Sequence, residues 1–299
     1  MSFIDPAILA GIKDLPLLAR TVIDSFMNGS NKSQLRGEGI EFSQYRSYQP
    51  GDDLRQLDWK MFARSDRYYI RESQIDASVS IRFILDTSAS MGHEDERLSS
   101  GMSLKKIDYA RFIIASLAYL AYLQGDAVGL TLISSHGSVQ IEPRHSFQHL
   151  NSLWHHLEKI TVAETFPAGQ DQVTGGGSQK KELVIFVTDF YEQQAEITRY
   201  IEVCQRRRHE VLVMHLMAKN EMNFSYADNT SLVDLETGIS LEVNTRLMKD
   251  TYLSELNMFL KNTRAAMLST QVAYHLFTMD QPLDRAIKEF LVMRKRIQA

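Results

Sequence analysis

The sequence has only one cysteine and little net charge, and each of these features excludes a class of protein. Cys204 has no second cysteine with which to form an intramolecular disulfide, and a cysteine-rich zinc site is excluded. The formal net charge is −4 at pH 7, so no basic field predicts binding to nucleic acid or to an anionic membrane. A chain of 299 residues, 44% apolar and 23% charged, is long enough and apolar enough to bury a sizeable core.

Long apolar runs and targeting segments are also missing. The most apolar stretch, residues 112–123, is too short to span a bilayer and predicts a buried helix. The N-terminal "MSFIDPAILAG" has no basic segment followed by an apolar core, so no signal peptide is expected. Phosphate-loop and dinucleotide-binding glycine patterns are absent, which weighs against intrinsic nucleotide hydrolysis. We therefore expect a cytoplasmic protein without a transmembrane segment.

From about residue 77, apolar strand-like runs alternate with helical segments. Near-continuous apolar strands in such an alternation predict a mostly parallel sheet that is covered on both faces. The stretch "SSHGSVQIEP" predicts a hairpin into an antiparallel edge strand, and residues 231–243 predict a second hairpin that turns at "ETG". We expect a doubly wound α/β domain over residues 77–299, preceded by a helical and irregular N-terminal extension over residues 1–76.

Two of the predicted strands end in an aspartate, "FILD" at Asp86 and "FVTD" at Asp189. The carboxyl ends of parallel strands meet at one edge of a sheet, where open α/β sheets form their ligand sites. If the two strands are neighbours, both carboxylates lie beside Ser88 and Ser90 of the first loop. Oxygen ligands of this kind suit Mg²⁺ or Mn²⁺ and suit zinc poorly. The competing interpretation is that Asp86 and the serines only cap the next helix.

These residues also carry a resemblance to known families. Residues 86–90, "DTSAS", resemble the D-x-S-x-S metal-ion-dependent adhesion motif of von Willebrand factor A-type domains, and "VTD" resembles their later aspartate loop. "RGEGIEF", "YRSYQPGDDLRQLDWK" and "VDLETG" closely resemble the family called domain of unknown function 58, and the resemblance covers nearly the whole chain. It implies a von Willebrand factor A-like fold. Members are commonly encoded beside MoxR-type AAA+ ATPases, which implies a partner or adaptor of such an ATPase.

The resemblance also implies a third hydroxyl ligand, a threonine on a loop between the second and third helices. Thr165 in "VAETFPAG" is the candidate, with Thr161 as the alternative. Relatives usually have a glycine before this threonine and a regular helix after it, whereas here Pro167 and a "TGGGS" run follow. The implied metal ligands are Asp86, Ser88, Ser90, Thr165 and Asp189.

The segment from Tyr48 to Trp59 combines a Pro-Gly turn with several aspartates and arginines. Asp52 or Asp53 can bond the backbone after the turn, and the arginines can pair with the carboxylates. We expect this segment mainly to brace the extension, with Trp59 as its core anchor, rather than to bind a ligand.

Three functions remain open at this point. The first is a non-enzymatic module that binds an acidic side chain of a partner through Mg²⁺. The second is a Mg²⁺-dependent phosphoryl-transfer enzyme with Asp86 as nucleophile. Enzymes of the haloacid dehalogenase type usually have a general-acid aspartate two residues later, where Ser88 stands, and no lysine is obviously placed to stabilise phosphoryl oxygens. The third is a structural protein whose metal site has degenerated.

Overall fold

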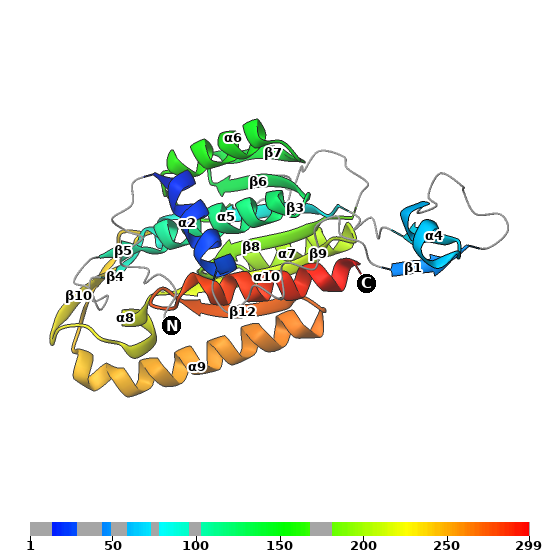
Figure 1. Ribbon diagram of the computed structural model, residues 1–299. Helices are drawn as coiled ribbons and strands as arrows, with labels where there is room; N and C mark the ends of the chain where they lie inside the picture. The colour runs from blue at the N-terminus through cyan, green and yellow to red at the C-terminus, as the bar shows by residue number, and fades with distance from the viewer. Residues whose placement is uncertain are drawn as a thin grey trace.

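A computed structural model describes residues 14–28, 44–48, 59–72, 78–95, 103–167 and 181–298. Its centre is a six-stranded sheet in the order β12-β9-β8-β3-β6-β7 (Figure 1). Neighbouring strands are parallel except β7, which pairs antiparallel with β6 at the edge, so the predicted mixed sheet is confirmed. The strands are β3 (Ser80–Asp86), β6 (Ala127–Ser134), β7 (Gly137–Arg144), β8 (Leu183–Thr188), β9 (Glu210–Met217) and β12 (Ala273–Thr278).

Helices cover both faces of this sheet. One face packs against α5 (Lys106–Leu123), α6 (Phe147–Glu158) and α10 (Leu283–Gln298), and α2 (Leu15–Asn28) packs on α5 and α6. The other face packs against α7 (Glu196–Arg206) and the end of α9 (Thr245–Ser269). Alternate side chains of β3 point to opposite faces, because Phe83 and Leu85 belong to the first core and Ile84 to the second. This two-sided burial explains the apolar strand sequences.

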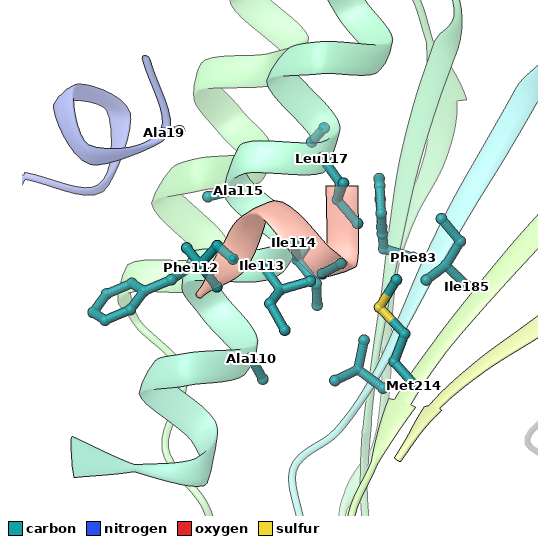
Figure 2. Packing of buried hydrophobic residues seen from close by; sticks show 14 of the residues in the cluster. Ala19, Phe83, Ala110, Phe112, Ile113, Ile114, Ala115, Leu117, Ile185 and Met214 are labelled. Atoms are coloured by element: carbon teal, nitrogen blue, oxygen red, sulfur yellow. The ribbon is translucent and has the colours of Figure 1, made fainter. Parts of the chain in front are cut away.

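Helix α5 is buried almost all round because it has neighbours on both sides. Figure 2 shows it between Ala19 of α2 and the sheet residues Phe83, Ile185 and Met214. A helix in such a position needs apolar residues around most of its circumference, as the stretch at residues 112–123 has. Helix α2 belongs to the predicted N-terminal extension but contributes to the main core; a boundary at residue 76 stays a prediction. No helix in the described ranges is long and apolar enough to cross a membrane.

A small unit formed by residues near the N-terminus lies away from these elements. Strand β1 (Gln44–Ser47) pairs antiparallel with β2 (Tyr69–Glu72), and α4 (Trp59–Ser65) separates them along the chain. Phe62 stacks on Tyr68 with ring centroids 4.5 Å apart, whereas Trp59 is 63% exposed and meets Phe62 only edge-on. The prediction that Trp59 is a core anchor is therefore wrong. Residues 49–58 lie outside the described ranges, so the bracing role of their polar network stays a prediction.

Short elements gather at the carboxyl ends of the parallel strands, at the opposite end of the sheet from β1 and α4 (Figure 1). They include a 3₁₀ turn (Ala89–Gly92), the pair β4 (Glu94–Asp95) and β5 (Leu104–Lys105), and helix α8 (Lys219–Asn223). The second predicted hairpin is confirmed as the antiparallel pair β10 (Thr230–Val233) and β11 (Ser240–Val243). These elements surround the ends of β3 and β8, where Asp86 and Asp189 lie.

Candidate functional site

Strand β3, which ends at Asp86, and strand β8, which Asp189 follows directly, are neighbours, so the condition for the two carboxylates to meet is fulfilled. Leu85 of β3 pairs with Val187 of β8 in parallel register, so both strands deliver their last residues to the same edge. Asp86 and Asp189 are 0% and 7% exposed. A pair of buried carboxylates at one edge requires compensation by hydrogen bonds, protons or cations.

Hydroxyl groups link the two carboxylates into one chain of contacts. Asp86 Oδ1 accepts the amide of Ser88 at 2.9 Å, and Asp86 Oδ2 accepts the hydroxyl of Thr188 at 2.8 Å. The Ser88 and Ser90 hydroxyls lie 3.0 Å apart, and Ser90 Oγ donates to Asp189 Oδ1 at 3.1 Å. The structure thus brings Asp86, Ser88, Ser90 and Asp189 together, which the helix-cap interpretation does not require. No hydrogen bond from the Ser88 side chain caps the 3₁₀ turn that follows it.

Thr165 lies close to this group without joining its hydrogen bonds in the described structure. The amide of Ala163 donates to the carbonyl of Thr87, and the amide of Ala89 donates to the carbonyl of Glu164, which fixes the loop beside the serines. Thr165 is exposed and lines a pocket of about 220 Å³ together with Tyr191. Its role as a ligand stays a prediction, as does that of the alternative, Thr161.

A buried lysine that no sequence motif indicates also contacts this group. Lys106, the first residue of α5, donates from Nζ to Asp189 Oδ2 at 3.0 Å and to Glu221 Oε1 at 2.8 Å. Burial alone would lower the pKa of Lys106, but the carboxylates of Asp189 and Glu221 outweigh it and raise the pKa above its ordinary value. The sequence showed no lysine in an obvious place to stabilise phosphoryl oxygens, and the structure places Lys106 beside Asp189. The only sequence signal of Lys106 is a place at the start of the first helix after the motif.

The pKa values of the two aspartates shift in opposite directions, and of the two only Asp189 contacts the lysine in the described structure. Burial and the nearby charge of Asp189 raise the pKa of Asp86 to about 6. Burial would also raise the pKa of Asp189, but Lys106 outweighs it and holds that pKa below its ordinary value. The ammonium group of Lys106 thus compensates the charge of Asp189. Asp86 remains a buried anion near neutral pH, which is unfavourable for the folded state.

A third carboxylate faces these two from the β10–β11 turn. Burial, followed by the charges of Asp189 and Asp86, raises the pKa of Glu236 to about 7, while Ser90 offsets part of the effect. The Oε1 atom of Glu236 is buried and has no hydrogen-bond partner among the described residues. The sequence shows Glu236 only as part of "VDLETG", which indicates a turn and gives no sign of its position in space.

The donor set fits a hard divalent cation. It consists of oxygen atoms only, and among the described residues its Asp86 carboxylate has no cationic partner. It borders the Glu236 oxygen that accepts no hydrogen bond from those residues. Among the described residues, no three or more His, Cys, Asp or Glu side chains form a group that could hold a metal ion by themselves. A cation here would therefore depend on the hydroxyls of Ser88 and Ser90, as in an adhesion-type site.

Comparison with known proteins gives the family. Residues 44–258 match the family described as "Protein of unknown function DUF58". This chain belongs to the DUF58 family. The uncharacterized proteins Mb1516 of Mycobacterium bovis and Rv1480 of Mycobacterium tuberculosis are each 22% identical to it over 242 residues, which cover 80% of this chain and 74% of the relative.

Solved structures that are similar to this DUF58 protein match it at low sequence identity. BatB from Bacteroides thetaiotaomicron matches with a TM-score of 0.45 and 14% identity, over 73% of this chain and 100% of the other. The SpRpn10 VWA domain matches with a TM-score of 0.39 and 8% identity, over 71% of this chain and 95% of the other. The predicted von Willebrand factor A-like fold is confirmed by the order and direction of the strands.

Proposed function

We propose that this DUF58 protein is a non-enzymatic, metal-dependent protein-binding module. Asp86, Ser88, Ser90 and Asp189 would hold Mg²⁺ or Mn²⁺, with Thr165 at the rim of the site. The bound cation would offer an open coordination position to an acidic side chain of a protein partner. The observation that carries the proposal is a series of contacts between the two carboxylates: Asp86 accepts the Ser88 amide, the Ser88 hydroxyl contacts the Ser90 hydroxyl, and the Ser90 hydroxyl donates to Asp189.

The chain's own residues would orient such a site. The 3.0 Å contact between the serine hydroxyls keeps both oxygens on the same side of the loop. Lys106 holds Asp189 through Oδ2, and Oδ1 accepts the Ser90 hydroxyl and the Tyr191 amide. The partner that we propose is a MoxR-type AAA+ ATPase in the cytoplasm, as the family resemblance implies.

A Mg²⁺-dependent phosphoryl-transfer enzyme is the second candidate, and Lys106 is the observation in its favour. The ammonium group of Lys106, however, is bound to Asp189 and Glu221 rather than to Asp86, the residue that would act as nucleophile. Ser88 occupies the place of the general acid and contacts Ser90. A serine does not donate a proton readily at neutral pH, so the geometry supports binding better than catalysis.

The test is capture of the ATPase by the tagged full-length protein from native lysate, in Mg²⁺ and again in EDTA. Ser88→Ala removes one hydroxyl oxygen from the site, and Ser152→Ala, on the exposed surface of α6, serves as the matched control. We expect retention of the ATPase to fall at least tenfold, about 1.4 kcal/mol, in EDTA and in Ser88→Ala, and to persist in Ser152→Ala. Equal retention under all these conditions would place the interface elsewhere. Mg²⁺-dependent release of phosphate from a generic ester that is lost in Asp86→Asn would support the enzyme.

A further inference from the structure

The turn between β10 and β11 has a fixed shape. Asp234 accepts the amides of Glu236 at 2.9 Å and Thr237 at 3.3 Å, and also the hydroxyl of Thr237 at 2.8 Å. Gly238 donates its amide to the carbonyl of Asp234 and has a φ of +72°, a conformation that glycine adopts without strain. The backbone of the turn therefore holds Glu236 in one place.

The loop that carries Asp189 also holds this turn. Tyr191 donates its hydroxyl to Asp234 Oδ2 at 2.9 Å and its amide to Asp189 Oδ1 at 3.3 Å. One residue thus connects the candidate metal ligand to the turn. The two hydrogen bonds of Tyr191, in addition to the pairing of the hairpin strands, therefore fix the position of Glu236 at the site.

One oxygen of the Glu236 carboxylate lacks a partner in the described part of the chain. Its Oε1 atom is buried and accepts no hydrogen bond from any described residue, while Ser90 and the charges of Asp189 and Asp86 act on the same carboxylate. A buried carboxylate oxygen without a donor is costly, and a cation held by the neighbouring serines and aspartates would remove that cost. The arrangement is the one expected of an acidic side chain that approaches an adhesion-type cation.

The hairpin can also leave this position at small cost. Four of its large apolar side chains are exposed and contribute little to the core; they are Val233, Leu235, Ile239 and Leu241. A segment with few buried apolar contacts opens more easily than the core does. The pocket lined by Thr165, Tyr191 and Glu236 gives an incoming side chain access next to the carboxylate.

We propose that Glu236 is an internal acidic ligand, which occupies the place of the partner's carboxylate in the resting protein and must be displaced when the partner binds. This inference rests on the proposed function, because it requires a cation at Asp86, Ser88, Ser90 and Asp189. It adds regulation to that site, since the hairpin would compete with the partner for the same coordination position.

The test uses Mn²⁺ as the metal and acetate as the probe for a carboxylate, with the full-length protein. Water proton relaxation reports how many water molecules the bound Mn²⁺ keeps, and an acetate titration reports access to the open position. Glu236→Gln removes the carboxylate charge at similar size, and Glu242→Gln, exposed on β11 of the same hairpin, is the matched control.

We expect Glu236→Gln to raise the relaxivity of bound Mn²⁺. We also expect it to tighten acetate binding about tenfold, which is the change expected if Glu236 leaves the coordination position open in about a tenth of wild-type molecules. Glu242→Gln should match the wild type. Saturable Mn²⁺ binding with unchanged relaxivity and acetate affinity in Glu236→Gln would overturn the internal ligand and leave the metal site standing. Absence of saturable Mn²⁺ binding in the wild type would overturn both.

Discussion

Asp86→Asn is expected to stabilise the metal-free protein at neutral pH and to abolish its response to Mg²⁺. The wild-type carboxylate is fully buried and its pKa is raised to about 6, so the folded state disfavours the charged form. Asparagine keeps an oxygen for the Ser88 amide and carries no charge. At about 1.4 kcal/mol per pKa unit, the rise from 3.8 to about 6 corresponds to a gain on the order of 3 kcal/mol.

The pH dependence of this gain has a defined sign. A carboxyl group whose pKa is higher in the folded than in the unfolded state destabilises the folded state at pH values above the folded-state pKa. This destabilisation disappears at pH values below the unfolded-state pKa. The advantage of Asp86→Asn should therefore be full above pH 6 and shrink as the pH falls through 6 towards the ordinary value of 3.8.

Denaturant unfolding in EDTA at pH 7.5 and pH 5, repeated at pH 7.5 with Mg²⁺, measures these effects. At Mg²⁺ a hundredfold above its dissociation constant, the wild type should gain about 2.7 kcal/mol and Asp86→Asn should gain nothing. Asp250→Asn, exposed on α9, is the control and should behave like the wild type. An Asp86→Asn protein that is less stable than the wild type in EDTA at both pH values would contradict the account.

Lys106→Met is expected to have the opposite effect, a loss of about 3–5 kcal/mol in EDTA, because removal of one partner leaves buried charges uncompensated. The Lys106 side chain is 5% exposed and bonds Asp189 and Glu221, whose side chains are 2% and 19% exposed. Mg²⁺ should restore part of the loss, since a cation at the site compensates Asp189 directly.

Thermal and denaturant unfolding of Lys106→Met with and without Mg²⁺ tests this expectation. Lys105→Met, exposed and adjacent in sequence, should change stability by less than about 0.5 kcal/mol. A Lys106→Met protein with the stability of the wild type in EDTA would show that the ammonium group is not the resident cation of the site. Equal destabilisation with and without Mg²⁺ would show that no metal replaces it.

Much of the fold and half of the site could be predicted because they depend on local pattern. Apolar strands buried on both faces read as unbroken apolar runs, and a strand that ends in aspartate marks the carboxyl edge of a parallel sheet. Asp86 and Asp189 come together for that reason, although they are far apart in sequence. Ser88 and Ser90 follow because they belong to the loop that leaves the first of these strands.

The residues that were missed reach the site through tertiary contacts that leave no local pattern. Lys106 stands beside Lys105 in the sequence, and only the packing of α5 on the sheet decides which ammonium group is buried. Glu236 lies in an ordinary turn signature, and its position depends on the hydrogen bond from Tyr191 to Asp234. The prediction for Trp59 was wrong for a different reason: this large aromatic residue was expected to be buried, and it is exposed.

Calorimetric titration of Mg²⁺ into the wild type, Ser90→Ala and Asp86→Asn shows whether these residues hold a cation. Ser90 contributes only a hydroxyl, so Ser90→Ala removes a ligand oxygen without changing the charge of the site. We expect saturable binding of a single ion per chain in the wild type and its loss in both variants. No saturable binding in the wild type, or the same binding in Asp86→Asn, would contradict this expectation.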